Sequence, residues 1–190
     1  MMAVPISGTI GTPDQPQEPD QPQEKKPVMT EERQPLHSGG CQCGAVRYAL
    51  YAEPYNRHIC HCRMCQKAFG AFFAALTAVD LHDFTWTRGA PAVFLSSAQV
   101  ERGFCPACGT PLSFRHLETE RINLSIGSLD APARVRPERQ IGIEGRVPWF
   151  SELAALPEAH TDETVPDERL AGIETRQHPD RETEAWPPRS

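Results

Sequence analysis

The sequence predicts an all-β domain, and three observations support this fold class. Several short segments alternate apolar and polar residues with the period of two that is typical of half-buried strands. Only one short stretch has the features of a helix, and all seven cysteines lie between residues 41 and 108 at the spacings of metal ligands. Many short strands with few helices are typical of packed or coiled antiparallel sheets.

The expected strands begin directly after the first two cysteines. There Val46, Tyr48 and Leu50 occupy alternate positions, so they share one face of a strand. A continuous apolar run over residues 72–79 is bounded by Gly70 and Asp80, and it predicts a more deeply buried strand. The remaining expected strands cover residues 84–87, 93–95, 112–115, 122–126 and 141–143.

The one expected helix runs from Arg63 to about Phe69. It follows Cys62 directly and has the length of one or two turns. Gly70 is placed to end it, because glycine adopts the left-handed conformation of a helix C-terminus without strain.

The chain divides into one globular domain and two tails. Residues 1–36 contain seven prolines, and the hexamer PDQPQE occurs there twice, at 13–18 and at 19–24. This segment has no apolar face to offset the entropy cost of ordering, so we expect a disordered Pro/Gln-rich tail. Residues 161–190 carry a net charge of −4 and are expected to form an acidic, disordered tail. Residues 37–160 form the expected domain, with a net charge of +1.

Composition excludes several classes of protein. No apolar run approaches the ~18–20 residues needed to span a bilayer. The N-terminus lacks the basic start and apolar stretch of a secretory signal. The nearly neutral domain has no cluster of Lys and Arg, which argues against nucleic acid as a partner. We therefore expect a soluble cytoplasmic protein that binds neither membranes nor nucleic acids.

The cysteines indicate metal ligation and not disulfide bonding. An odd number of cysteines without an export signal argues against a disulfide scaffold. Closely spaced thiolates suit tetrahedral zinc, whereas the Cys-x-Cys pair is unlike the common spacings of iron–sulfur ligands. The cysteines fall into two pairs and one triplet, which are Cys41 and Cys43, Cys105 and Cys108, and Cys60, Cys62 and Cys65.

Seven ligands divide most simply into four and three. Cys60, Cys62 and Cys65 lie within six residues and can meet one metal ion without help from elsewhere. The two pairs then complete each other across about sixty residues, as a closed four-thiolate site of the structural kind. The sequence thus predicts two zinc ions per chain, of which the three-cysteine ion keeps an open coordination position typical of catalytic zinc.

Other residues near the triplet bear on that open position. His58 is close enough to complete a Cys3His site, and it is the alternative to an open position. His61 lies between two ligands, so we expect its side chain to face away from the metal. Arg63 and Lys67 follow on the expected helix and either attract an anionic substrate or are solvated charges.

The cysteine groups together resemble the glutathione-dependent formaldehyde-activating family, which includes the centromere protein V-like proteins. The resemblance covers about residues 38–157. The motifs that carry it are GCQCG at 40–44, CHCRMC at 60–65 and GFCPACGTPL at 103–112, with GSLD at 127–130 and VPW at 147–149 downstream.

The resemblance implies a fold, an activity and the assignment of the cysteines to two zinc sites. The fold is the Mss-type all-β zinc fold of coiled antiparallel sheets. Cys41, Cys43, Cys105 and Cys108 match the structural zinc site, and Cys60, Cys62 and Cys65 match the zinc site associated with catalysis. One departure is visible: many members have a His-Ile-Trp-like segment where this chain has Gln140-Ile141-Gly142.

Two functions of different classes follow. The first is a carbon–sulfur lyase that adds glutathione to formaldehyde or another small aldehyde, giving S-hydroxymethylglutathione or its analogue. Zinc would deprotonate the thiol and hold it beside the aldehyde. The alternative is a non-catalytic zinc-binding module that binds a protein partner.

Overall fold

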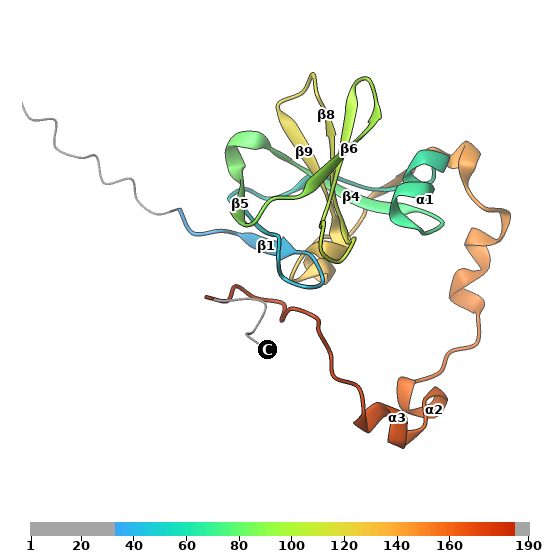
Figure 1. Ribbon diagram of the computed structural model, residues 1–190. Coiled ribbons are helices and arrows are strands. Elements are labelled where there is room, and N and C mark those ends of the chain that lie inside the picture. Colours follow the sequence, from blue (N-terminus) through green and yellow to red (C-terminus); the bar gives the residue numbers. More distant parts are fainter. Residues whose placement is uncertain (1–32, 185–190) are drawn as a thin grey trace, which may run out of the picture. The chain divides into compact units, whose positions relative to one another are not determined.

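The computed structural model describes residues 33–184, which form a domain of two β-sheets (Figure 1). Ten short strands account for most of the regular structure of these residues, so the predicted all-β fold is confirmed. The repeated hexamers and nearly all of the expected N-terminal tail lie outside the described residues. No helix among the described residues is long and apolar enough to cross a membrane.

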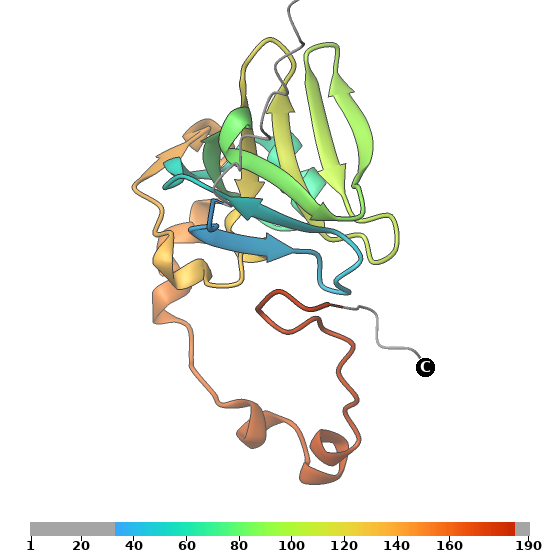
Figure 2. The same ribbon diagram turned by 90° about the vertical axis from the view of Figure 1, so that its left-hand side faces the viewer.

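The smaller sheet has three antiparallel strands in the order β1-β2-β5. Their bounds are β1 (His37–Gly40), β2 (Arg47–Leu50) and β5 (Phe84–Arg88). The apolar alternation predicted around β2 is present, and Tyr48 and Leu50 are fully buried. In Figure 2 the blue strands of this sheet cross below the ends of the longer green and yellow strands.

The larger sheet has seven strands, and only the pairing of β10 with β3 is parallel. In spatial order the strands are β10 (Arg139–Ile141), β3 (Tyr55–Cys60), β4 (Ala74–Asp80), β9 (Arg121–Ser125), β8 (Pro111–His116), β7 (Val100–Phe104) and β6 (Ala92–Ser97). Strands β1, β3 and β7 have no counterpart among the strands expected from sequence. The strand expected at 141–143 ends at Ile141, because Gly142 turns the chain with a φ of 63°.

Helix α1 (Arg63–Phe69) has the bounds predicted for it. Gly70 ends the helix in the left-handed conformation, and its N–H donates a hydrogen bond to the Gln66 carbonyl. Two further short helices, α2 (Thr161–Thr164) and α3 (Asp167–Ala171), lie in the expected acidic tail. Single 3₁₀ turns connect many of the strands; they are η1 (Leu81–Asp83), η2 (Ile126–Ser128), η3 (Pro132–Arg134), η4 (Ile143–Gly145) and the longer η5 (Pro148–Ala155).

The C-terminal segment returns to the smaller sheet. His178 is buried, and its N–H donates to the Gln42 carbonyl over 2.7 Å. Glu182 accepts a hydrogen bond from Arg47 of β2, and the Arg88 guanidinium of β5 contacts Thr183. The domain boundary at residue 160 and the disorder of residues 161–190 stay predictions, but this part of the tail contacts the domain.

A buried ion pair links β2 to the loop after β9. The Arg47 side chain is only 2% exposed, and its two Nη atoms donate to the two carboxylate oxygens of Asp130 over 2.8 and 2.5 Å. Ser38 Oγ donates to the same carboxylate. This bidentate ion pair holds both side chains in place, because both are largely buried and water cannot take the place of either charged partner.

We predict that Asp130→Ala lowers the free energy of unfolding by about 3 kcal/mol, because among the described residues it leaves the buried Arg47 charge with Glu182 as its one acidic partner. Glu138→Ala is the matched control, since Glu138 pairs with Arg57 at the surface. Its cost should stay below about 1 kcal/mol. Urea unfolding of both variants measures the difference, and equal costs would contradict the prediction.

Candidate metal centres

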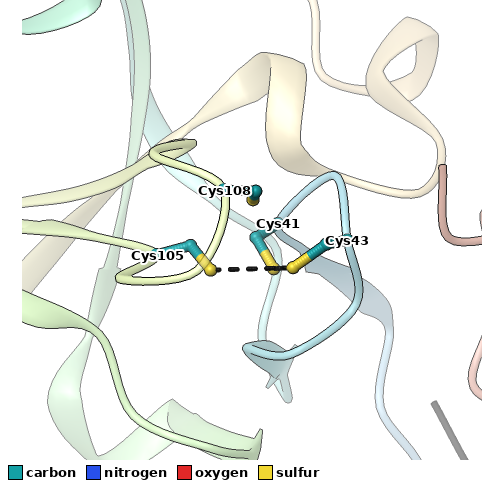
Figure 3. A group of neighbouring side chains, drawn as sticks. All are labelled: Cys41, Cys43, Cys105 and Cys108. Carbon is teal, nitrogen blue, oxygen red and sulfur yellow. Dashed lines mark hydrogen bonds between the residues drawn. The ribbon is translucent and has the colours of Figure 1, made fainter. Parts of the chain in front are cut away.

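Four cysteines from two distant turns meet at one point. Cys41 and Cys43 lie in the turn from β1 to β2, and Cys105 and Cys108 lie in the turn from β7 to β8. Their four Sγ atoms are all within 4.8 Å of one another. Figure 3 shows the two loops facing each other. The Sγ atoms of Cys43 and Cys105 are 3.8 Å apart.

The spacing of these sulfurs fits a tetrahedral metal ion. With a Zn–S bond of about 2.3 Å, the sulfurs of a tetrahedral site lie about 3.8 Å apart. The Cys41–Cys43 and Cys43–Cys105 sulfur distances are 3.6 and 3.8 Å. The residues present therefore form a group that could hold a metal ion with all four ligands supplied by the protein.

The local backbone prepares the two turns for this role. Gly44 and Gly109 have φ angles of 75° and 77°, which L side chains rarely adopt, and each follows the second cysteine of its pair. The Gly109 N–H donates to the Cys105 carbonyl, and the Val46 N–H donates to Cys41 Sγ over 3.3 Å. Both turns are therefore tight knuckles with their sulfurs directed inward.

The electrostatics of the four thiols favour a bound cation. Burial raises the pKa of the Cys41, Cys43 and Cys105 thiols. At Cys108 burial also acts to raise the pKa, but the Thr110 hydroxyl and backbone N–H groups outweigh it and lower the value to about 6. Four thiolates so close together repel one another, so a dication is the natural partner for the cluster.

The remaining three cysteines form a second cluster. Cys60 ends β3, Cys62 is the residue before α1, and Cys65 lies in the first turn of that helix. Their three Sγ atoms are within 4.8 Å of one another, and those of Cys60 and Cys62 are 3.5 Å apart. This spacing also fits a tetrahedral metal ion, but here the protein supplies three sulfur ligands.

Neither neighbouring histidine joins the three-cysteine cluster among the residues that the structure describes. His58 is buried, and its Nδ1 lies 2.6 Å from the Asn56 carbonyl oxygen. His61 is fully buried on another side: its Nε2 contacts Gln140 Oε1, and its ring packs edge-on against Phe150. His58 lines the same cavity as the three cysteines but is not part of their ligand group in this structure, so the open position stays a prediction.

The three cysteines line a cavity of about 470 Å³, which we call the cluster cavity. Its walls combine apolar side chains, such as Met64, Leu76 and Ile141, with the cations Arg102 and Arg121, and none of its lining residues is acidic. The cavity size lies in the range of small-molecule sites. The cluster is therefore accessible to a small ligand.

The thiols of this cluster differ in acidity. Burial raises the pKa of Cys60 to about 12 and also raises that of Cys65. At Cys62 burial acts in the same direction, but the Cys65 N–H and the other thiols outweigh it, with a contribution from the Arg102 charge, and the pKa falls.

Arg102 is a site residue that our sequence analysis missed. It lies on β7 and is 7% exposed, and its Nη2 is 3.5 Å from Cys65 Sγ. One signal was available: Val100, Arg102 and Phe104 share one face of a strand, and a charge between two apolar residues there is unusual.

The segment that departs from the family pattern lies against the cluster. Strand β10 pairs with β3, with Ile141 opposite Cys60. Gly142 follows with a φ of 63°, and a Cβ built on it would lie 2.8 Å from the Cys62 nitrogen. A side chain at position 142 would therefore displace the backbone of a cluster residue.

Three comparisons relate this chain to known proteins. A model of the family described as glutathione-dependent formaldehyde-activating enzyme matches residues 36–144. An uncharacterized lyase of Schizosaccharomyces pombe is 28% identical over 82 residues, which are 43% of this chain and 59% of that relative. The chain thus spans less than two thirds of the relative's length. A crystal structure of a Rhodobacter sphaeroides protein gives a TM-score of 0.45 at 22% identity, covering 54% of this chain and 98% of that one.

We predict two metal ions per chain, because each cluster provides ligands for one. Elemental analysis of protein grown with zinc and gently desalted should give a zinc-to-chain ratio near two. A ratio of one, or iron in place of zinc, would contradict the division into four and three.

We further predict that the two clusters differ in their effect on folding. Cys105→Ser should unfold the domain, since the lost bond joins turns that are 62 positions apart at Cys43 and Cys105. Cys62→Ser should leave the fold intact and lower the zinc content by one ion, because its partners are sequence neighbours. Circular dichroism with zinc analysis measures both, and loss of the fold in Cys62→Ser would contradict the prediction.

Proposed function

Since this chain belongs to the glutathione-dependent formaldehyde-activating family, we propose that it is a zinc-dependent carbon–sulfur lyase that forms or cleaves the adduct of glutathione with a small aldehyde. The observation that supports this most directly is the three-cysteine cluster, which has an incomplete sulfur shell and opens into a cavity of about 470 Å³. The S. pombe relative is likewise named a lyase.

The proposed reaction is an addition without redox change. In the forward direction the thiol sulfur forms a bond to the aldehyde carbon, and the C=O double bond becomes single. The thiol proton ends on the former carbonyl oxygen, so glutathione and formaldehyde give S-hydroxymethylglutathione. No oxidant or leaving group is needed.

Cys60, Cys62 and Cys65 would hold the zinc ion of this site. When bound, zinc supplies Lewis-acid stabilisation of a thiolate or of a carbonyl oxygen at neutral pH. The protein contributes the surroundings: Met64, Leu76 and Ile141 give the cavity apolar walls, and Arg102 provides a fixed positive charge beside Cys65. Fixed charges in such a site favour the developing oxyanion of the addition.

The four-cysteine cluster would hold the second zinc ion as a structural site. All four of its ligands come from the protein, which leaves no position for a substrate. Its two turns belong to different sheets. We therefore assign its zinc to the fold and not to the reaction.

The aldehyde partner of this chain need not be formaldehyde. Ile141, in the segment that departs from the family pattern, lines the cluster cavity. Gly142 stands where many family members have an aromatic residue, and its backbone approaches Cys62 so closely that a Cβ there would lie 2.8 Å from the Cys62 nitrogen. We propose a small aldehyde, with formaldehyde as the first one to test.

The remaining proposals follow from charge and from the state of the cysteines. All seven cysteines are free thiols, which suits a reducing compartment and supports the cytoplasm as the location. The expected domain carries a net charge of +1, so nucleic acid is not among the proposed partners. Glutathione and the aldehyde are the proposed ones.

We predict that the zinc-loaded protein accelerates the exchange between ¹³C-formaldehyde and glutathione. Cys62→Ser should slow the catalysed rate by about 100-fold or more, because binding and orientation of the two reactants are lost together. Magnetisation-transfer NMR measures the rate. Ala107→Ser is the control, since it adds a serine to the exposed part of the other cysteine turn without removing a ligand. An unaccelerated reaction with two zinc ions bound would contradict the proposal and favour a non-catalytic binding module.

A further inference from the structure

Arg102 is a buried cation with one donor group unused. Its Nε donates to Ser96 Oγ, its Nη2 lies 3.5 Å from Cys65 Sγ, and its guanidinium stacks on the Phe114 ring at 5.0 Å. Its Nη1 is buried and has no hydrogen-bond partner among the described residues. A buried guanidinium N–H without an acceptor is costly, so Arg102 has hydrogen-bonding capacity that its described protein neighbours leave unused.

Arg102 also lines a second cavity, of about 480 Å³, which we call the helix cavity. Helix α1 and strand β6, both labelled in Figure 1, contribute the other lining residues. Arg63 and Lys67 from α1 bring the number of cations to three, and none of the lining residues is acidic. Three cations in a cavity that no acidic residue lines provide a site for an anion.

The helix cavity adjoins the reactive cluster. Met64 and Arg102 line both this cavity and the cluster cavity that contains Cys60, Cys62 and Cys65. A ligand whose anionic end contacts Arg102 therefore reaches the sulfur cluster within the length of a few bonds.

We propose that the helix cavity binds a carboxylate of the thiol substrate, with Arg102 as its buried anchor and Arg63 and Lys67 as its outer cations. This inference depends on the proposed function in one respect only, which is the identification of the ligand as a thiol that carries a carboxylate. A carboxylate matches the planar fork of a guanidinium, which explains the use of arginine at the inner position.

A simpler role for Arg102 is to balance the negative charge of three thiolates. That role accounts for the contact with Cys65, but it leaves Nη1 without an acceptor and gives no function to Arg63 and Lys67. The two roles differ in one measurable respect: charge balance does not make ligand affinity depend on a carboxylate.

The test uses the zinc-loaded full chain and S-methylglutathione, which keeps both carboxylates of glutathione but has no free thiol to bind zinc. Calorimetric titration should show binding, and the diester of the same compound should bind at least about 10-fold more weakly, since each charge-assisted hydrogen bond lost costs that much. No measurable binding of the acid, or equal affinity of acid and diester, would overturn the proposal.

Three variants assign the effect to the cavity. Arg102→Gln should weaken S-methylglutathione binding by about 10-fold or more, and the pair Arg63→Gln/Lys67→Gln by a few-fold. The pair Arg134→Gln/Arg136→Gln removes the same charge from exposed positions that line neither cavity, and its affinity should equal that of the wild type. If Arg102→Gln fails to fold, the comparison of Arg63→Gln/Lys67→Gln with Arg134→Gln/Arg136→Gln decides. Equal affinity of these two double variants for S-methylglutathione would overturn the proposal.

The outcome is separable from that of the proposed function. Loss of affinity in the variants supports the carboxylate site even where no aldehyde adduct forms. Conversely, equal acceleration of adduct formation with glutathione and with 2-mercaptoethanol, which has no carboxylate, would overturn the carboxylate site while supporting the lyase.

Discussion

The structure depends on one constraint, the meeting of two distant cysteine turns. Cys41 and Cys43 belong to a turn of the three-stranded sheet, and Cys105 and Cys108 belong to a turn of the seven-stranded sheet. A metal ion held by all four would join the two sheets beside the buried core, to which Cys41 and Cys105 belong. Because the site forms only when both sheets are in place, its binding energy is also folding energy.

In our account the four-cysteine cluster has the structural role, so the three-cysteine cluster is available for catalysis. Cys60, Cys62 and Cys65 are neighbours in sequence and are positioned by the end of β3 and the start of α1, so their cluster needs no distant chain to assemble. We predict that it retains an incomplete ligand shell without loss of the fold. In our proposal the cations that line the two cavities, Arg102 above all, select the ligand that binds beside it.

The sequence was informative where the determinants are local. The spacing within the triplet predicted the three-cysteine cluster, and Gly70 predicted the end of α1, because each depends on residues a few positions apart. The four-cysteine cluster joins pairs that are 62 positions apart at Cys43 and Cys105, and it was predicted from the division of seven ligands into four and three. The short strands β1 and β7 were not predicted: each is only four or five residues long, and its pairing depends on partners elsewhere in the chain. The same applies to Arg102 and to the return of His178, whose contacts lie 37 and 131 positions away, at Cys65 and Arg47.

Cobalt substitution tests most directly the central claim that one cluster is closed and the other is open. Cobalt(II) replaces zinc in thiolate sites, and its visible absorption reports the number and kind of its ligands. With two cobalt ions bound, addition of glutathione should change the spectrum of one ion, and in Cys62→Ser, which keeps only the four-cysteine ion, it should change nothing. A spectrum that glutathione leaves unchanged in the wild type, or alters in Cys62→Ser, would contradict the account.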